Sequence, residues 1–134
     1  RGLETGIDGL SERSADRDLL PMAEALGLGA ALWSPLGGGL LTGKYRDSRE
    51  GRLTGFGGVL VRTEQGARET ATVDAVLAIA GEHDVAPVQV AIAWLLARSP
   101  VMLPIPGTSQ LGHLAENAAA AAMRPTEAEM RAIG

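Results

Sequence analysis

The stretch ALWSPLGGGLLTGKY at residues 31–45 decides the fold class of this chain. Its first residues belong to a compact apolar run, Gly29 to Trp33, which is typical of a buried parallel strand. The run ends abruptly in a Ser-Pro-Leu segment and three glycines at residues 34–39, which allow close approach to the backbone. We therefore predict a buried strand whose carboxyl end opens into a loop that can contact a ligand.

A second apolar run, Val101 to Ile105, ends in a similar Pro-Gly-Thr-Ser junction at residues 106–109. Apolar residues at helical spacing predict helices before, between and after the two runs. The order of strand, loop, helix, strand, loop and helix is typical of a parallel α/β sheet or barrel. We expect the two runs to be adjacent parallel strands, and any ligand to lie between the two junctions at their carboxyl ends.

The helices are predicted from stripes of apolar residues and from proline and glycine at their ends. Gly27 is expected to end the first helix, and Pro87 to be the first residue of the third, with Val88, Ile92, Leu95 and Leu96 facing inward. The expected ranges are residues 16–26, 70–82, 87–99, from the 106–109 junction to about 123, and 125–130. Residues 2–9 predict a short strand or an irregular entry, and residues 45–68 a long surface loop.

Length, charge and residue composition limit the functions that this chain can have. The 134 residues suit one domain, residues 1–134, but a complete eight-stranded α/β barrel needs about 250. A net charge of −4 without a cationic cluster argues against a nucleic-acid partner. The absence of cysteine and the presence of only two histidines argue against a metal site. No apolar run approaches a membrane span and no signal peptide is visible, so we expect a cytoplasmic protein that binds a small molecule.

Three ordered motifs resemble aldo-keto reductases, especially the bacterial and potassium-channel-β-like branches. Residues 31–45 are similar to the seventh-strand signature of that family, and PIPGTS at 104–109 followed by HLAEN at 113–117 to its eighth-strand signature. The segment VQVAIAWLL at 88–96 resembles the helix between them. The similarity runs from about Ser11 to the end and implies the carboxyl-terminal half of a (β/α)8 TIM barrel. The expected fold class is thus α/β, with about three parallel strands and flanking helices.

The same resemblance implies a binding site for NADP(H). Trp33 would stack on the nicotinamide, and the pyrophosphate would be held by Ser34, Leu36, Gly37 and Lys44. Residues around the adenosine half would be Gly107, Ser109, His113, Glu116 and Asn117. His113 stands where many members carry Arg or Gln, and Gly107 where some carry Lys, so the preference for NADP over NAD stays open.

Two departures from the family pattern bear on activity. Residues 5–9 read TGIDG where members carry a Gln-x-Glu-Tyr-Ser motif whose Gln holds the nicotinamide carboxamide. The Asp, Tyr, Lys and His tetrad of the family lies in its amino-terminal half, and no residue here can be assigned those roles. Tyr45 is the only tyrosine. We therefore expect that the isolated chain does not reduce aldehydes with NADPH.

Structural interpretations compete with several of these assignments. Trp33 fits a core aromatic as well as a pocket wall, and Lys44 fits a solvated loop cation. His113, with Glu116 and Asn117, fits an exposed helix face, since the three fall at spacings of three and four. Trp94, within a helical stripe, is expected to be structural, and His83 to be a surface residue.

Three classes of function remain open. The chain is part of an NADPH-dependent carbonyl reductase, or a truncated relative repurposed for a non-redox cyclisation or isomerisation, or a cofactor-sensing or interaction module without chemistry. Three strands cannot close a barrel, and an open strand edge is normally covered. We therefore expect either a homodimer or an amino-terminal half that completes the barrel.

Overall fold

The computed structural model of the chain describes residues 17–33, 35 and 67–134, with the backbone alone over residues 67–70. Helix α1 (Leu19–Ala25) leads into strand β1 (Ala30–Trp33), and helices α3 (Ala67–His83) and α4 (Pro87–Arg98) precede strand β2 (Met102–Ile105). Helix α5 (Leu111–Ala119), a 3-10 turn η3 (Ala120–Ala122) and helix α6 (Glu127–Ile133) follow. The described part of the chain therefore alternates helices with two short strands. The strand or entry predicted at residues 2–9 and the loop predicted at 45–68 lie outside it, apart from residues 67 and 68, which begin α3.

The two strands form a parallel pair, as predicted. Ala30 pairs with Met102 at one end and Trp33 with Ile105 at the other, so the two carboxyl ends lie side by side. The Ala30 N–H donates to the Val101 carbonyl at 2.8 Å, which extends the ladder by one bond at the amino end. This register brings the last residues of both strands to the same end of the sheet.

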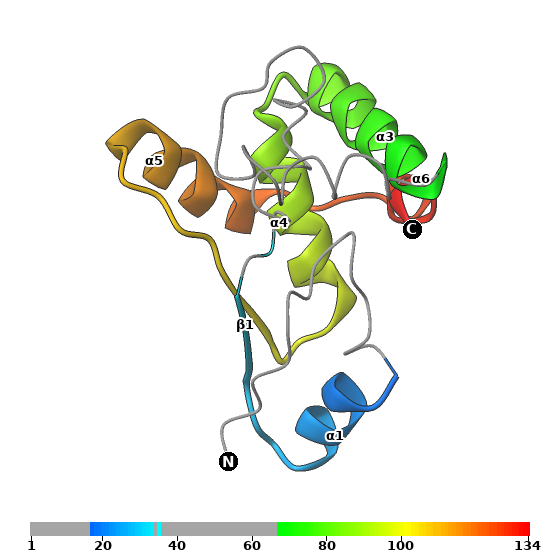
Figure 1. The fold of residues 1–134 in the computed structure, drawn as a ribbon, viewed down its shortest axis with the longest axis vertical. Helices are drawn as coiled ribbons and strands as arrows, with labels where there is room; N and C mark the ends of the chain where they lie inside the picture. Colours follow the sequence, from blue (N-terminus) through cyan, green and yellow to red (C-terminus); the bar gives the residue numbers. More distant parts are fainter. Residues whose placement is uncertain (1–16, 34, 36–66) are drawn as a thin grey trace, which may run out of the picture.

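Helix α4 is the centre of the core. Six consecutive side chains, from Val90 to Leu95, are buried, and Trp94 is only 1% exposed. In Figure 1 the helix lies between α5 on one side and α3 with α6 on the other, and it also contacts β2. The core is therefore aliphatic helix packing around one tryptophan, and the structural interpretation of Trp94 is confirmed.

One of the four side chains predicted to face inward from α4 departs from the prediction. Ile92 and Leu95 are buried and Val88 is half-buried, but Leu96 is 37% exposed. The prediction for Leu96 was wrong because helical periodicity identifies a stripe but does not tell how far the neighbouring elements extend over it.

Several residues at the helix ends have the backbone conformation or the hydrogen bonds that start or end a helix. Gly27 has φ +66°, and Ser99, before Pro100, is extended and ends α4. Pro87 is the first residue of α4, as predicted, and the Ala86 N–H donates to Gln89 Oε1 at 3.0 Å. These contacts satisfy groups that every helix leaves free at its ends.

Helix α5 is shorter than predicted. It begins at Leu111 because Gln110 is extended and its N–H donates to Thr108 Oγ1 at 3.1 Å, which keeps the preceding turn out of the helix. The α-helix ends at Ala119 and tightens into η3 before Met123. Helix α6 begins two residues later than predicted and reaches Ile133, which is buried.

Among the described helices, none is by itself long and apolar enough to cross a membrane. Ala71–His83 and Pro87–Arg98, which are bent by 106° relative to each other, meet the length and composition criteria only as a pair.

Candidate functional site

The paired ends of the two strands place Trp33 beside Ile105. Both side chains are about half exposed, at 50% and 53%, and so neither is a core residue in this structure. Trp33 therefore presents an aromatic surface at the carboxyl edge of the sheet, where ligands bind in parallel α/β folds. Ser34, Leu36, Gly37 and Lys44 lie outside the described residues.

The junction after β2 leads from this edge to the amino end of α5. Gly107, Ser109 and His113 are exposed, and Gly107 has open space where a Cβ would lie. The first hydrogen bond of the helical type runs from the Leu114 N–H to the Gln110 carbonyl, at 3.0 Å. The amides of residues 111–113 therefore stand at the positions where a helix offers free donors to an anion.

Asn117 lies one helical turn after His113. It is half-buried, as is Glu116, whereas His113 is exposed. Within the part of the chain that the structure describes, Asn117 Oδ1 is the buried side-chain oxygen or nitrogen without a hydrogen-bond partner. A buried acceptor without a donor costs free energy, so the carbonyl oxygen of this side chain has an unused capacity to accept a hydrogen bond.

Five of the ten predicted site residues lie on the one segment that follows directly from β2. These are Gly107, Ser109, His113, Glu116 and Asn117. A sixth, Trp33, lies at the end of the adjacent strand and pairs with Ile105, two residues before Gly107. Chemically, this arrangement can offer an aromatic face, backbone donors at a helix start and an acceptor oxygen one turn further on.

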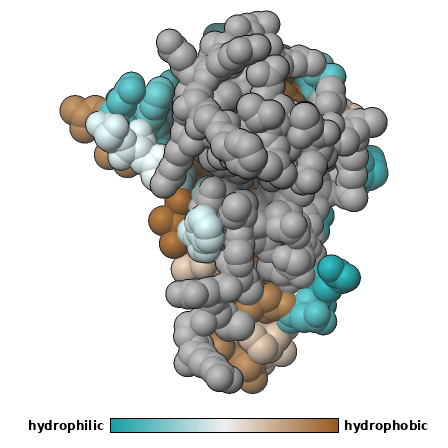
Figure 2. Space-filling model, in the orientation of Figure 1, coloured by the Kyte–Doolittle hydropathy of each residue, from teal (hydrophilic) through white to brown (hydrophobic). Residues whose placement is uncertain are grey.

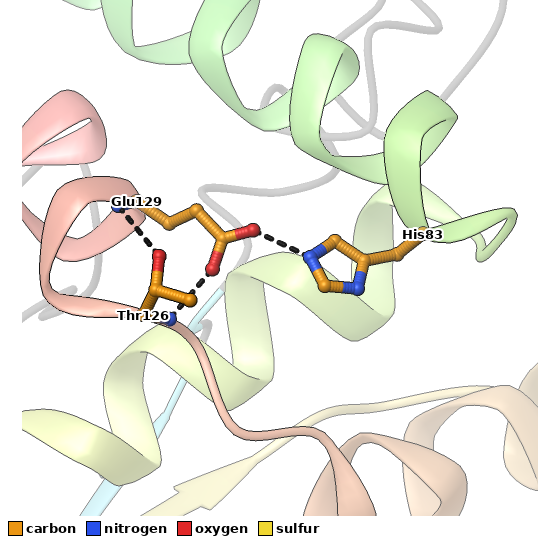
Figure 3. Close-up of polar contacts among 3 residues, drawn as sticks. All are labelled: His83, Thr126 and Glu129. Atoms are coloured by element: carbon orange, nitrogen blue, oxygen red, sulfur yellow. Dashed lines mark hydrogen bonds and ion pairs between the residues drawn. The ribbon is translucent and has the colours of Figure 1, made fainter.

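A second polar cluster joins α3 to α6 and was not predicted (Figure 3). The His83 ring nitrogen Nε2 lies 2.5 Å from Glu129 Oε1, and the other carboxylate oxygen accepts from the Thr126 N–H at 2.6 Å. The Glu129 N–H donates to Thr126 Oγ1 at 3.2 Å, which completes a capping box. The Thr126 N–H and the His83 ring lower the pKa of the Glu129 carboxyl.

Part of this cluster had a sequence signal. Thr126-Glu127-Ala128-Glu129 is a capping-box pattern that sequence analysis could have found, but His83 lies 46 residues away and has no such signal. In the described residues, no group of three or more potential metal ligands comes together, here or elsewhere. The cluster fastens two helix ends and has no catalytic partner that the structure describes.

A shallow groove of about 360 Å³ lies away from the strand ends. It contains none of the predicted site residues, and Ser99, three residues before β2, places it toward the amino end of the sheet. In barrels that end serves stability rather than chemistry. Its lining residues are Leu20, Pro21, Glu24, Ala97, Arg98, Ser99 and Met130.

Comparison with known proteins identifies the class. The model of the aldo/keto reductase family matches residues 8–134, nearly the whole chain. The chain therefore belongs to the aldo/keto reductase family, and the family resemblance of its motifs is confirmed.

Individual relatives show what share of a family member's length this chain matches. The aldo-keto reductase str7 of Strobilurus tenacellus is 37% identical over 117 residues, which are 86% of this chain and 35% of that protein. The uncharacterized oxidoreductase YrpG of Bacillus subtilis is 38% identical over 98 residues, which are 73% of this chain and 28% of that protein. The chain spans about a third of the length of these relatives.

A solved structure supports the fold. A thermostable aldo-keto reductase in complex with the inhibitor epalrestat superposes with a TM-score of 0.65 and 24% identity, over 95% of this chain and 36% of that one. The fold class, an α/β part of a TIM barrel, is thereby confirmed.

Proposed function

We propose that these residues form the dinucleotide-binding part of an NADP(H)-dependent carbonyl reductase. Membership of the aldo/keto reductase family supports the class of reaction. The observation that carries the cofactor assignment is Asn117 Oδ1, a buried acceptor without a partner among the described residues, one turn beyond a helix start with free amides. An amino group of adenine is a donor of the kind that this oxygen lacks.

The remaining residues fit the two ends of a dinucleotide. The half-exposed face of Trp33 suits the nicotinamide ring, because flat aromatic systems stack on one another. Ser109 and His113 are exposed at the start of α5 and suit a ribose or its 2′-phosphate. Ser34, Leu36, Gly37 and Lys44, with a cation and backbone donors, remain the proposed pyrophosphate residues.

The bound cofactor would supply a hydride, and the residues of this chain would hold the two ends of the dinucleotide in place. Trp33 would hold the ring plane at the carboxyl edge of the sheet, and α5 would fix the distal end. The proton that accompanies hydride transfer needs an acid that we cannot assign to any residue of this chain. Carbonyl reduction is accordingly proposed for a barrel of which this chain is one part.

Titration calorimetry with NADPH tests the proposal on the chain and on two variants. Trp33→Ala and Asn117→Ala are each expected to weaken binding by about five- to thirtyfold, in line with about 1–2 kcal/mol for a lost stacking or hydrogen-bonding contact. Leu26→Ala, at an exposed position that follows α1 and precedes the amino end of β1, is the matched control and should leave affinity unchanged. Unchanged affinity in both site variants would place the cofactor elsewhere.

The same pair of variants separates a repurposed small-molecule pocket from a dinucleotide site. Binding of a smaller, non-redox ligand held against Trp33 would be weakened by Trp33→Ala but not by Asn117→Ala, because Asn117 lies six residues beyond the start of α5. That outcome, with no measurable NADPH binding, would favour the cyclase or isomerase alternative.

A further inference from the structure

The two histidines of the chain lie in different surroundings. The His83 ring contacts Glu129 between α3 and α6, with 2.5 Å between Nε2 and the carboxylate oxygen. His113 lies in the first turn of α5 and is exposed, and within the described part of the chain its ring has no hydrogen-bond or ion-pair partner. Figure 2 shows teal and brown surface at the outer left, where Figure 1 draws α5. Both ring nitrogens of His113 are therefore open to a ligand.

The segment proposed to hold the adenosine half of the cofactor has no permanent positive charge. Between Arg98 and Arg124 the sequence contains no Lys or Arg, so His113 is the one side chain of residues 99–123 that can become a cation. Glu116, three residues further along α5 and half-buried, is the one carboxylate among them. A 2′-phosphate at the start of α5 would thus meet neutral backbone amides and a carboxylate, but no cation, while His113 is neutral.

The elements packed against α5 bring no further charge to its start. They are α4 and η3, and η3 consists of three alanines. The one charged side chain of α4 is Arg98, whose guanidinium lies 4.8 Å from the centre of the Trp94 ring and lines the groove beside Met130 of α6. In Figure 1, α5 and α6 lie on opposite sides of α4, so Arg98 faces away from α5. Among the described residues, His113 and Glu116 therefore set the charge at this helix start.

We propose that His113 discriminates NADP(H) from NAD(H), and that it does so only when its ring is protonated. This role rests on the proposed dinucleotide site and adds which group sets its cofactor preference. An imidazolium donates a charge-assisted hydrogen bond to a phosphate, whereas a neutral ring leaves the phosphate charge uncompensated. The 2′-hydroxyl of NAD(H) is uncharged and gains nothing comparable from the proton.

The direction of the pH dependence follows from this chemistry. Histidine side chains in general gain their charge as pH falls from about 8 to about 5. A phosphate monoester keeps most of its second negative charge down to about pH 6.5, because its second pKa is about 6. NADP(H) should therefore gain affinity relative to NAD(H) as pH falls from about 8 to about 6.5.

Titration calorimetry with NADPH and with NADH at these two pH values tests the role of His113. The measured quantity is the dissociation constant of NADH divided by that of NADPH. In the parent chain this ratio should rise about fivefold or more from about pH 8 to about pH 6.5. His113→Gln should give a low ratio and His113→Arg a high ratio, each nearly independent of pH.

His83→Gln is the matched control. It removes the other imidazole of the chain, which lies on α3 and is held by Glu129, and the ratio should keep the pH dependence of the parent chain. Circular dichroism should show equal melting temperatures for the parent chain and both His113 variants, because the exposed ring has no partner in the fold that the structure describes.

Proton uptake supplies a second readout, which a merely structural role of His113 would not change. At about pH 7.5, NADPH binding should take up a fraction of a proton, because a bound phosphate favours the imidazolium. The uptake is measured from the binding enthalpy in buffers of different ionisation enthalpy. NADH binding should take up less, and His113→Gln should remove the difference between the two nucleotides.

The outcomes separate this role from the proposed function. If NADPH and NADH bind but their ratio stays constant with pH, or changes equally in His113→Gln, the role of His113 is overturned and the dinucleotide site stands. If neither nucleotide binds the parent chain at either pH, the proposed function is overturned and this role with it.

Discussion

The indole nitrogen of Trp94 donates a hydrogen bond to the Met130 carbonyl at 3.2 Å and so joins α4 to α6 within the core. Replacing Trp94 with Phe removes this bond and leaves part of the indole volume empty. The Met130 carbonyl keeps a second donor, the Gly134 N–H at 3.1 Å, and so is not left unpaired. We expect a loss of about 1–3 kcal/mol in unfolding free energy, mainly from the cavity.

Urea unfolding followed by circular dichroism measures this loss. Leu96→Ala on the same helix is the matched control, because Leu96 is 37% exposed and should cost less than half as much. Equal losses in the two variants would mean that Trp94 packs less specifically than its burial indicates.

The Glu129 carboxyl makes part of the stability pH-dependent. Its pKa in the folded chain is lowered, first by the Thr126 N–H and then by the His83 ring. A lowered carboxyl pKa contributes stability that is fully present above the ordinary value of about 4.3 and is lost as pH falls through the folded value. Unfolding free energy should therefore fall in this acidic window, and Glu129→Gln should flatten the dependence.

Glu127→Gln is the control for this titration. Glu127 lies two residues away in the same helix turn and is 93% exposed, paired with Arg131 at 3.4 Å. Exposed pairs of this kind contribute about 0–1 kcal/mol, so the acid limb of the stability curve should survive in this variant. Urea titrations at a series of pH values compare the two, and an identical flattening in both would reject the assignment to Glu129.

Two glycines with open surroundings are expected to respond in opposite directions to alanine. No atom lies within 4 Å of a Cβ built at Gly27 or Gly81, so neither variant meets a steric clash with other residues. Gly27 has φ +66°, which costs an L-residue about 1–2 kcal/mol, whereas Gly81 lies inside α3. Gly27→Ala should destabilise, and Gly81→Ala should stabilise by about 0.5–1 kcal/mol.

Thermal melts of Gly27→Ala and Gly81→Ala test whether the two variants change stability in opposite directions. Opposite shifts in melting temperature are expected, and shifts of the same sign would show that the Gly27 backbone relaxes out of the left-handed region.

The sequence predicted the strand pair because both apolar runs are short and end at Gly/Pro junctions. Short apolar runs with such ends favour strands over helices. The predictions for Leu96 and the start of α5 were wrong because those depend on tertiary coverage and on a single side-chain bond, Thr108 Oγ1 with the Gln110 N–H. The contact of His83 with Glu129 had no signal, since nothing local relates residues 46 positions apart.

The assignment of the candidate site residues to a ligand stays a prediction. The parallel register places Trp33 beside Ile105, two residues before Gly107, so the start of the second junction lies where the sequence predicted it. Burial of Asn117 Oδ1 without a partner could not be foreseen, since it depends on the packing around α5 rather than on spacing.

Asn117 should therefore show a trade-off between stability and binding. Its Oδ1 is buried and has no hydrogen-bond partner among the described residues, so the folded chain carries the desolvation cost of that oxygen without a compensating bond. Asn117→Ala removes the oxygen from a half-buried position on α5, and alanine also has the higher helix propensity, by about 0.5 kcal/mol. We expect the variant to unfold at the same or a higher urea concentration than the parent chain. Glu116→Ala, at the adjacent half-buried position, has no such oxygen to remove and should gain less, because Glu is already a better helix former than Asn. A loss of stability above about 1 kcal/mol in Asn117→Ala alone would show that its amide serves the fold, and would remove the reason for assigning it to a ligand.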